Sequence, residues 1–410
     1  MEDKELYRHL LGLTPPWSVS RVELSVKTQQ VDVWVEHSAE LRWSCPECNV
    51  ELPLYDHAEE RAWRHLDSCQ FLTYLHARPP RVLCPTHGAR QVKLPWAEPH
   101  SRFTQLFERL AIDVLKETSI RGATRILRIS WDEAWHLMQR AVVRGLRAKV
   151  RRLPGYLGVD EKSISKWDKY MTLVCDLDSS TVEYIGDGRR IESLTPYFTG
   201  FSLEEREGIR AVAMDMWQPY IQSTLDNVPG AADKIVFDLF HLMTYMNEAV
   251  DHVRKRENRD LREEGDDTLK GSLHIWLYAK ENLPERHRQR FEELKQMNLK
   301  TGRAWAIKES LRELWKKPTI EEARDHWKPW YWWATHSRLK PVIDAARVIK
   351  RHLHNVLTYF VHRITNAVSE GINSKIQTVK KKAYGFRSFE NFKTAIFFHC
   401  GGLKLYPVTH

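Results

Sequence analysis

The chain has little of several features that would place it among secreted or membrane proteins. Its 410 residues contain only six cysteines, too few for a disulfide scaffold, so we expect a reducing, cytoplasmic setting. No stretch approaches the roughly 18 apolar residues that a membrane-spanning helix needs. Residues 1–13 are charged and have only a short apolar run, which argues against a signal peptide.

An excess of acidic residues is also absent. The chain has 63 lysines and arginines against 54 aspartates and glutamates, a net charge of +9 and a pI near 9.1. This balance suits a polyanionic partner. Hydrophobic residues make up 42% of the sequence, enough for a sizeable core, and the length allows about two to four domains.

Two pairs of possible metal ligands lie in the N-terminal part of the chain. They are Cys45 with Cys48 and Cys84 with His87. In each pair two residues separate the ligands, so a tight turn can present both side chains to one ion, and three cysteines with one histidine form a closed site for one structural Zn²⁺. Competing ligands without a partner at short spacing are His57, His65 and Cys69. The alternative, four unrelated buried residues, leaves the proline after the first cysteine of both pairs unexplained.

We expect these ligands to belong to a zinc-binding module over residues 1–97. A short helix is expected before the break at Pro15 and Pro16. Alternating valines predict a hairpin over residues 22–35, and a further strand is expected at residues 71–75, between the two ligand pairs.

Residues 98–150 carry a helical pattern. Apolar residues at helical spacing predict helices at 103–115, 120–128 and 131–144. Ser130 is a plausible N-cap, and Glu133 completes a capping box. Two short helices with a tight junction in a basic segment favour a helix-turn-helix domain whose second helix reads DNA, although helical hairpins are also common core elements. The candidate DNA contacts are Arg121, Arg125, Trp131 and Arg140.

Residues 151–241 alternate between short apolar strands and helices, which predicts an α/β fold. The expected strands are 156–159, 170–177, 181–185, 209–214 and 234–237, and the expected helices are 191–201 and 219–225. Three strands are followed directly by an aspartate, namely Asp160, Asp215 and Asp238. An acid just past a buried strand lies at a sheet edge, where ligands bind. Taken alone, Asp160 has the alternative role of capping a turn.

Strand signals almost vanish between residues 242 and 354. Apolar residues at helical spacing predict an all-helical block of roughly four to six helices that interrupts the α/β pattern. Residues 327–338 hold four tryptophans, whose ordinary role is to fill a helical core. The functional alternative is that Trp332 or Trp333 stacks on an unpaired base while Arg338 or Lys340 holds the DNA backbone.

A helix with an unusual polar face is expected at residues 364–383, in a second part of the α/β domain over residues 355–410. Its apolar stripe is Val368, Ile372, Ile376, Val379 and Ala383. The opposite face carries Asn366, Glu370, Asn373 and Gln377, flanked by Lys380 and Lys381. One acid among amides and lysines differs from the mixed Lys and Glu face of an ordinary amphipathic helix, so we take Asn373, Lys380 and Lys381 as further candidate DNA contacts.

Asp160, Asp215 and Glu370 together make an oxygen-ligand set that suits two Mg²⁺ or Mn²⁺ ions. Two such ions activate a water or a 3′-hydroxyl and stabilise the leaving oxygen in phosphoryl transfer. The main rivals are Asp176 and Asp178. If the second strand is antiparallel, both rivals lie at the wrong end of it to meet Asp160.

These motifs resemble the DDE transposases of bacterial insertion sequences, of the ISL-three type. The matching segments are the two zinc pairs, Gly158–Glu161, Asp215–Tyr220, Asp238–His241, Asn366–Asn373 and Lys380–Phe386. The resemblance covers nearly the whole chain. It implies a ribonuclease-H-like catalytic domain interrupted by a helical insertion. It also implies binding of double-stranded DNA at terminal inverted repeats and at a target, by a homodimer or higher oligomer at the bacterial nucleoid, followed by strand cleavage and strand transfer.

Asp238 and His241 match a short motif of transposases with this insertion. We expect them to pack and hydrogen-bond behind the second aspartate, because a Mg²⁺ site rarely recruits histidine. Two other functions stay open: a DNA-binding regulator that has lost catalysis, and a structure-selective nuclease on the same fold. The intact acids argue against the regulator, and an end-specific N-terminal module argues against the nuclease.

Overall fold

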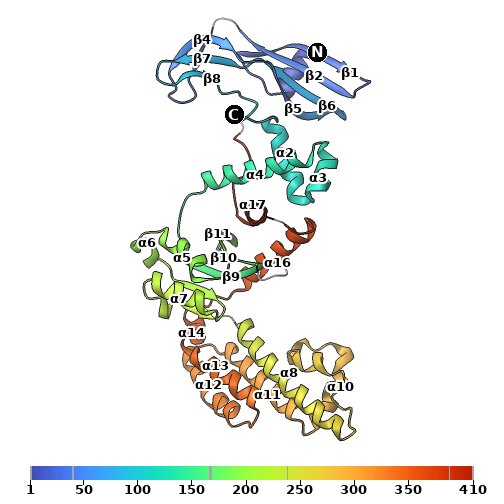
Figure 1. The fold of residues 1–410 in the computed structure, drawn as a ribbon, viewed down its shortest axis with the longest axis vertical. Helices are drawn as coiled ribbons and strands as arrows, with labels where there is room; N and C mark the ends of the chain where they lie inside the picture. Colours follow the sequence, from blue (N-terminus) through green and yellow to red (C-terminus); the bar gives the residue numbers. More distant parts are fainter. Residues whose placement is uncertain (1, 39–40, 166–168, 238, 387, 409–410) are drawn as a thin grey trace.

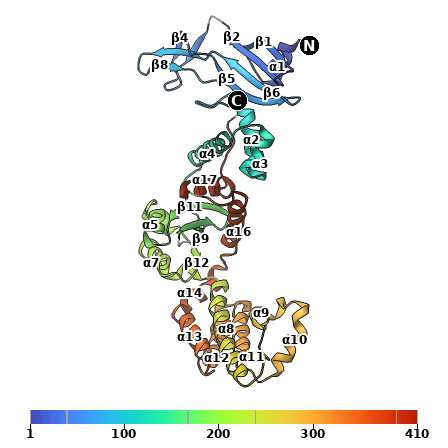
Figure 2. The ribbon, with the colours of Figure 1, turned by 45° about the vertical axis from the view of Figure 1, so that its right-hand side comes forward.

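The computed structural model describes residues 2–38, 41–165, 169–237, 239–386 and 388–408. The molecule is elongated, and its parts follow one another along the long axis (Figure 1). A β body at the N-terminal end is followed by a three-helix unit, a central sheet with helices, and a helical body at the far end. Figure 2 shows the same order from another side, with the C-terminal segment returning toward the β body.

The N-terminal β body contains the short helix α1 (Asp3–Leu10) and two four-stranded sheets. The first sheet has the order β1 (Trp17–Ser25), β2 (Gln30–His37), β6 (Phe71–Ala77), β5 (Arg61–Ser68). The second has the order β3 (Arg42–Ser44), β4 (Glu51–His57), β7 (Pro80–Cys84), β8 (Gly88–Gln91). The predicted hairpin is confirmed as the antiparallel pair β1 and β2, and the predicted strand between the zinc pairs is β6.

The three-helix unit consists of α2 (Gln105–Glu117), α3 (Ile120–Leu127) and α4 (Trp131–Ala148). The predicted capping box at Ser130 and Glu133 is present. These helices do not have a hydrophobic core of their own. Their buried residues Phe107 and Met138 belong to the same apolar cluster as Leu173, Ile376 and Phe397 of the central part. The unit is therefore held rigidly against the body that carries the candidate acids.

The central sheet has the strand order β11-β10-β9-β12-β13. Its strands are β9 (Tyr156–Ser165), β10 (Lys169–Asp176), β11 (Thr181–Asp187), β12 (Ala211–Met214) and β13 (Ile235–Phe237). Helices α5 (Ile191–Thr199) and α6 (Leu203–Glu207) precede β12, and α7 (Gln218–Asn227) follows it. Strand β10 is antiparallel to both of its neighbours, whereas β12 runs parallel to β9 and to β13.

The predicted end of the first strand, just before Asp160, is wrong. Strand β9 continues to Ser165, and Asp160 lies inside it, opposite Leu173 of β10. The polar residues after Val159 look like the end of a strand in the sequence. In the fold they stay in the strand because pairing with β10 continues along the whole hairpin.

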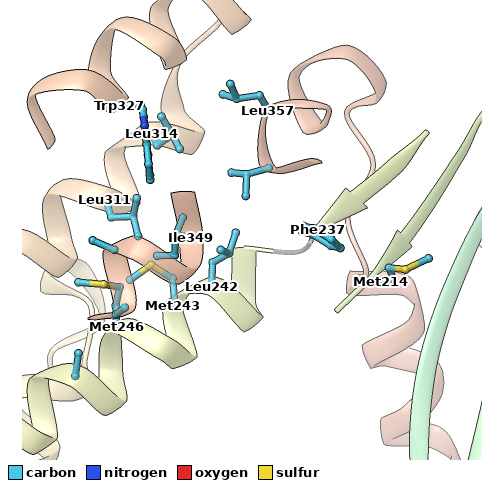
Figure 3. Close-up of a cluster of buried hydrophobic side chains, with 14 of the residues drawn as sticks. Met214, Phe237, Leu242, Met243, Met246, Leu311, Leu314, Trp327, Ile349 and Leu357 are labelled. Carbon is cyan, nitrogen blue, oxygen red and sulfur yellow. The ribbon is translucent and has the colours of Figure 1, made fainter. Parts of the chain in front are cut away.

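The helical body follows β13 without a break in the core. Its helices are α8 (Leu239–Glu263), α9 (Leu273–Leu277), α10 (Glu285–Gln296), α11 (Lys300–Arg312), α12 (Ile320–Thr335), α13 (Lys340–Arg351), α14 (Leu353–Leu357) and α15 (Tyr359–His362). The predicted block over residues 242–354 is covered by α8 to α13, in line with the four to six helices expected, while α14 begins at its end and α15 lies beyond it. Figure 3 shows the apolar cluster running from Met214 and Phe237 at the sheet to Leu242, Leu311 and Ile349 in the helices.

Two helices complete the central part. They are α16 (Ala367–Lys382), which packs on β9, and α17 (Phe389–Cys400), which lies between α4 and β11. Short 3₁₀ turns occur at η1 (Ala231–Asp233), η2 (Lys280–Asn282) and η3 (Glu313–Lys316). None of the helices in the described ranges combines the length and the apolar character that a membrane crossing requires.

Candidate functional site

The four predicted zinc ligands meet at one point of the second N-terminal sheet. Cys45 and Cys48 lie on the turn between β3 and β4, while Cys84 ends β7 and His87 precedes β8. Their ligand atoms all lie within 4.8 Å of one another. The Sγ atoms of Cys48 and Cys84 are 3.7 Å apart, and the Sγ of Cys84 is 3.4 Å from Nδ1 of His87. Two hairpin turns thus face each other as a closed Cys₃His site, which suits a structural Zn²⁺.

The competing ligands take other roles. His57 contacts His37, with their Nε2 atoms 2.8 Å apart, and His65 contacts the hydroxyl of Thr104 at 2.9 Å. Cys69 is exposed and stands outside the group. The fold therefore brings together the four ligands that were assigned from their spacing and leaves the competing residues outside the group.

Asp160 lies within β9, and Asp215 directly follows the end of its parallel neighbour β12. The register pairs Ala213 with Gly158, and each aspartate comes two residues after its member of that pair. Burial raises the pKa of Asp160 to about 6, and the Asp215 carboxylate adds to the rise. The pKa of Asp215 is likewise raised, chiefly by burial. Because both side chains are half-buried and the charge of Asp215 raises the pKa of Asp160, a bound cation is favoured over two bare charges.

Helix α16 brings its polar face to the same strand. Asn373 donates from Nδ2 to Oδ2 of Asp160 at 2.6 Å, and Lys162 donates to the carbonyl oxygen of Asn373 at 3.0 Å. Lys380 donates to the carbonyl oxygen of Ser163 at 3.1 Å. The contacts pin one side of α16 along β9, and Glu370 lies one turn before Asn373 on that side.

Gly158 explains how closely the helix approaches. A Cβ at this position would lie 2.1 Å from Oγ of Ser369 and 3.1 Å from Oδ1 of Asn366. Only glycine leaves room for α16 at this point of β9. The glycine of the Gly158–Glu161 motif is therefore a packing requirement of the helix that carries Glu370.

The three predicted acids are gathered less tightly than the zinc ligands. Within the described residues, the zinc set is the only group of three or more His, Cys, Asp or Glu ligand atoms within 4.8 Å of one another. Asp238 lies outside the described residues. His241 lies in the first turn of α8, and its electrostatic interaction with Asp160 and Asp215 opposes the rise of both pKa values.

The sequence analysis did not identify a cluster of side chains beside Asp215, although some of its members lie within the motifs named there. The guanidinium of Arg189 lies over the rings of Tyr170, at 4.0 Å, and Trp217, at 4.9 Å. Its Nη1 is 3.4 Å from Oε1 of Glu161, and the backbone N–H of Trp217 donates to Asp215 at 3.1 Å. The arginine pair after Gly188 was the available signal, but nothing in the sequence places it near Asp215.

The rival acid Asp176 closes a turn at the other end of β10. It pairs opposite Leu157 and is fully buried. Its carboxylate accepts hydrogen bonds from the N–H of Asp178 at 2.9 Å and the hydroxyl of Ser179 at 2.8 Å, and Arg152 lies 2.6 Å away. The antiparallel direction of β10 keeps this acid away from Asp160, as the sequence analysis expected.

Three predicted DNA contacts of the three-helix unit surround one groove. Arg121, Arg125 and Trp131 line a groove of about 870 Å³ between α3, α4 and the end of α16. Lys382 and Tyr384 line its other wall, and Tyr384 is 98% exposed. The groove has a basic rim and aromatic walls.

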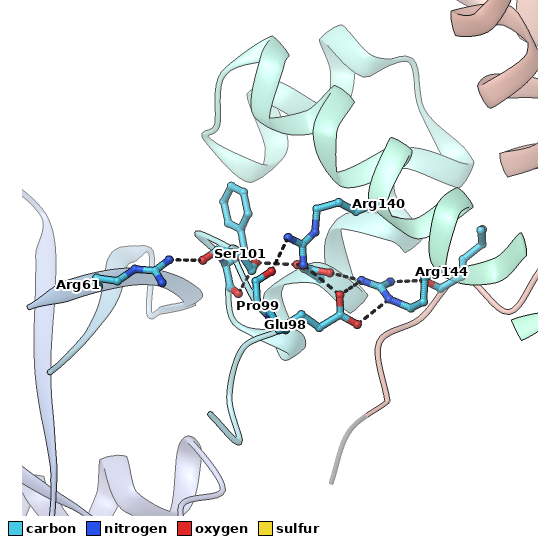
Figure 4. A network of polar contacts seen from close by, with 9 residues as sticks. Arg61, Glu98, Pro99, Ser101, Arg140 and Arg144 are labelled. Carbon is cyan, nitrogen blue, oxygen red and sulfur yellow. Dashed lines mark hydrogen bonds and ion pairs between the residues drawn. The ribbon is translucent and has the colours of Figure 1, made fainter. Parts of the chain in front are cut away.

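Arg140 has a different environment from the other predicted contacts. Its Nη2 is 3.0 Å from Glu98 and 3.3 Å from Glu108, and both carboxylates also bind Arg144 at 2.7 Å (Figure 4). Arg144 donates further to the carbonyl oxygen of Leu405 at 2.5 Å. This network ties α4 to α2, to the preceding linker and to the C-terminal segment, and it pairs the half-exposed Arg140 guanidinium with two carboxylates.

The tryptophans of α12 divide into two kinds. Trp327 and Trp330 are buried, and Nε1 of Trp330 donates to the carbonyl oxygen of Ile307 at 2.8 Å. Trp332 and Trp333 are 63% and 36% exposed. The core role therefore applies to the first pair, and the second pair is available for contact.

Comparisons with known proteins find matching families for three parts of the chain. The ISL3 DDE family described as "Transposase" matches residues 157–396, the "zinc-finger of transposase IS204/IS1001/IS1096/IS1165" matches residues 41–87, and the "Helix-turn-helix domain of transposase family ISL3" matches residues 92–142. The chain is 27% identical to the transposase for insertion sequence element IS1001 of Bordetella parapertussis, across 96% of this chain and 97% of that protein. It is 26% identical to the transposase for IS1557 of Mycobacterium tuberculosis (strain CDC 1551 / Oshkosh), across 95% and 93%.

Proposed function

The chain belongs to the ISL3 family of DDE transposases, and on this premise we propose that Asp160, Asp215 and Glu370 are the acids with which it cuts and joins DNA. The observation that carries the proposal is the register of β9 and β12, which sets Asp160 beside Asp215 while Asn373 ties the Glu370 helix to Asp160. The protein is a DNA transposase with a zinc ribbon and a helix-turn-helix domain.

We propose a ribonuclease-H-like catalytic domain in two parts, residues 151–241 and 355–410. An antiparallel hairpin pair followed by two parallel strands, with α16 packed on the sheet, supports this assignment. The helices between β13 and α16 then form an insertion over residues 242–354. The preceding parts are the zinc module, residues 1–97, and the helix-turn-helix domain, residues 98–150.

The donor atoms at the acids fit Mg²⁺ or Mn²⁺. Oδ1 of Asn373 and Oε2 of Glu161 are buried, and neither has a hydrogen-bond partner among the described residues. A cation is a suitable partner for these two oxygens, because Mg²⁺ and Mn²⁺ prefer carboxylate and amide oxygens. Asp160, Asp215 and Glu370 would hold two ions. When bound, the ions supply an activated hydroxyl and neutralise charge at the phosphate.

The chain's own groups position the acids. The amide of Asn373 and the backbone N–H of Glu161, which donates to Oδ1 at 2.7 Å, fix both oxygens of Asp160. The N–H of Trp217 fixes Asp215. We place Asp238 and His241 behind this pair as packing and hydrogen-bonding residues, not as ligands. The cations of Arg189 and Lys162 stand beside the acids, where they can hold phosphates of the DNA.

The DNA follows a path from the groove to the acids. We propose that Arg121, Arg125 and Trp131 contact the terminal inverted repeat and that Lys380 and Lys381 hold its backbone along α16. The helix-turn-helix unit and α16 share one apolar core, so a bound end is presented to the acids at a fixed distance. A homodimer or higher oligomer on DNA would pair two such ends.

The test is a cleavage assay on a duplex taken from the end of the insertion sequence that carries this gene. The transposase is expected to cut at the repeat boundary and to join the 3′ end to target DNA when Mg²⁺ is present. Binding of ends without any cleavage would favour the regulator. Cleavage of branched DNA regardless of the repeat would favour the nuclease.

A further inference from the structure

A small pocket lies at the seam between the first N-terminal sheet and the helix-turn-helix unit. It has a volume of about 330 Å³, and nothing in the proposed catalytic site uses it. Its polar lining consists of Arg61, Arg64, Tyr74, Arg102, Arg128 and Glu133. Four arginines from β5, the linker and the turn between α3 and α4 thus face one space.

The floor of the pocket is a buried arginine. Arg64 is 5% exposed, and its backbone bonds the linker on both sides, through its N–H to Arg102 at 2.9 Å and its carbonyl to Thr104 at 3.0 Å. Its guanidinium binds Asp67 and the carbonyl oxygens of His65 and Thr73. Its Nε is buried without a hydrogen-bond partner in the described residues. Arg64 is therefore held firmly at the floor of the pocket, and its Nε–H is a donor without a partner among the described residues.

The helix-turn-helix turn supplies a second arginine in an unusual conformation. Arg128 ends α3 with φ 55° and ψ 48°, the left-handed region that glycine adopts without steric cost. Its guanidinium also binds Asp67, so Asp67 bridges Arg64 and Arg128. Residues other than glycine that are held in this region gather at functional sites. Here an arginine side chain stands where backbone geometry alone would favour glycine.

The pocket keeps a net positive charge. Four arginines stand against Asp67 and Glu133, which leaves 4 − 2 = +2. Glu133 is occupied by the capping box, where its Oε2 accepts from the N–H of Ser130 at 2.9 Å. Arg61 donates to the carbonyl oxygen of Ser101 at 3.1 Å (Figure 4). Its guanidinium also lies over the ring of Trp63, at 5.0 Å from the ring centre. Arg102 is exposed, and no carboxylate in the described ranges pairs with its guanidinium.

We propose that this pocket binds a backbone phosphate of duplex DNA beside the start of α4, so that the zinc-stabilised β body and the helix-turn-helix grip the same strand. The inference rests on DNA binding by the helix-turn-helix. Guanidinium groups bind phosphate oxygens in a paired geometry, and the volume suits one phosphate with its sugar, not a base pair. The zinc ribbon then acts in DNA binding by placing Arg61 and Arg64 against the turn, without reading bases itself.

The first test measures binding of the full-length, zinc-loaded protein to end duplex without Mg²⁺ or Mn²⁺, so cleavage plays no part. Arg102→Gln is expected to weaken binding roughly 3- to 10-fold and to lower the slope of log K against log salt by about 0.9, the value for one phosphate contact. The matched control is Arg21→Gln, which removes an exposed arginine from β1, at the opposite edge of the same sheet. Equal effects of the two variants would overturn the proposal.

Arg128→Gly separates binding from folding. Glycine suits the left-handed conformation, so this variant is expected to keep or raise the melting temperature while end binding falls. A folded Arg128→Gly protein that binds like the wild type would contradict the assignment.

Replacing single phosphates of the DNA with uncharged methylphosphonates can identify the phosphate that the pocket contacts. A methylphosphonate scanned along the end duplex is expected to weaken wild-type binding at each contacted phosphate, and at one of these positions to have little further effect in Arg102→Gln. Losses that simply add at every position would show that Arg102 touches no phosphate. Because both measurements read binding alone, a protein that grips this phosphate but never cuts DNA would refute the catalytic proposal and leave this one standing.

Discussion

The zinc centre and the acidic site are built in opposite ways. Four zinc ligands come from two hairpin turns within one small sheet, and their atoms lie within 4.8 Å of one another. The proposed catalytic acids come from β9, from the residue after β12 and from α16, so their relative position depends on the register of the sheet and on the packing of a helix. The ligands of a structural metal site surround the ion from all sides. A catalytic site that receives DNA must stay open, so the positions of its residues depend on the fold of the whole domain.

Loss of the zinc site should have the largest effect. Binding of structural zinc contributes roughly 10–16 kcal/mol in zinc-finger peptides, which exceeds the stability of most small domains. We expect Cys48→Ser, or removal of zinc with a chelator, to unfold the second N-terminal sheet and to weaken end binding. Zinc content and circular dichroism of the purified protein measure this.

The control for that experiment is Cys69→Ser, because Cys69 is exposed and outside the ligand group. It should keep one zinc per chain and normal binding. Purified wild-type protein without zinc would contradict the assignment of the centre.

Loss of an acid should spare the fold and remove the chemistry. Asp160→Ala, Asp215→Ala and Glu370→Gln are each expected to lower Mg²⁺-dependent cleavage of end DNA by roughly 10³-fold or more, because each removes a ligand for charge that develops at the phosphate. Zinc content and end binding should stay near the wild-type values.

Asp178→Asn is the matched control for the acids, since Asp178 is an exposed acid beside the turn that Asp176 closes. Its cleavage rate should not change. An Asp160, Asp215 or Glu370 variant that cleaves like the wild type would remove that residue from the catalytic set.

The same contrast explains which features the sequence could predict. Zinc ligands follow from local spacing, and the helices of the helix-turn-helix unit follow from apolar periodicity and a capping box. The three candidate acids were named from motifs, but the contact of Asn373 with Asp160 depends on how α16 packs.

Other features depend on pairing that no local pattern shows. The strand around Asp160 was ended too early because its second half is polar. Strands β3, β4, β5, β7 and β8 were not predicted, because none shows a long apolar alternation in the sequence. Arg189 reaches Trp217 and Glu161 only because β11 and β12 are brought into one sheet.

Gly158 offers a way to disturb the acidic site through packing alone. The Cβ of Gly158→Ala would meet Oγ of Ser369 at 2.1 Å and Cδ2 of Leu177 at 2.8 Å, so α16 has to shift. Overpacking of this kind costs roughly 1–3 kcal/mol. We expect a lower melting temperature and a larger fall in cleavage than in end binding, with zinc content unchanged.

Gly371→Ala on the same helix is the control, because an added Cβ there meets nothing within 4 Å. It should be neutral or stabilise the helix by up to about 1 kcal/mol. If both glycine variants behaved alike, close packing of α16 on β9 would not be what positions Glu370.

The smallest effect is expected from the exposed tryptophans of α12. Stacking on an unpaired base contributes roughly 1–3 kcal/mol, and we expect the lower end here because Trp332 already stacks on His336 at 4.6 Å. Trp332→Ala with Trp333→Ala should leave stability within about 0.5 kcal/mol of the wild type, as for most surface changes. Cleavage or strand transfer should fall severalfold, and a substrate already unpaired next to the cut should restore part of it.

Trp327→Ala and Trp330→Ala provide the contrast, because both rings are buried. Truncation of a buried tryptophan costs roughly 3–5 kcal/mol, so these variants should melt earlier and lose binding, cleavage and transfer together. A stable Trp332→Ala, Trp333→Ala protein with normal cleavage and transfer would exclude base stacking by this pair. The helical body would then support the catalytic sheet only through the apolar core that runs from Phe237 to Leu242 and Ile349.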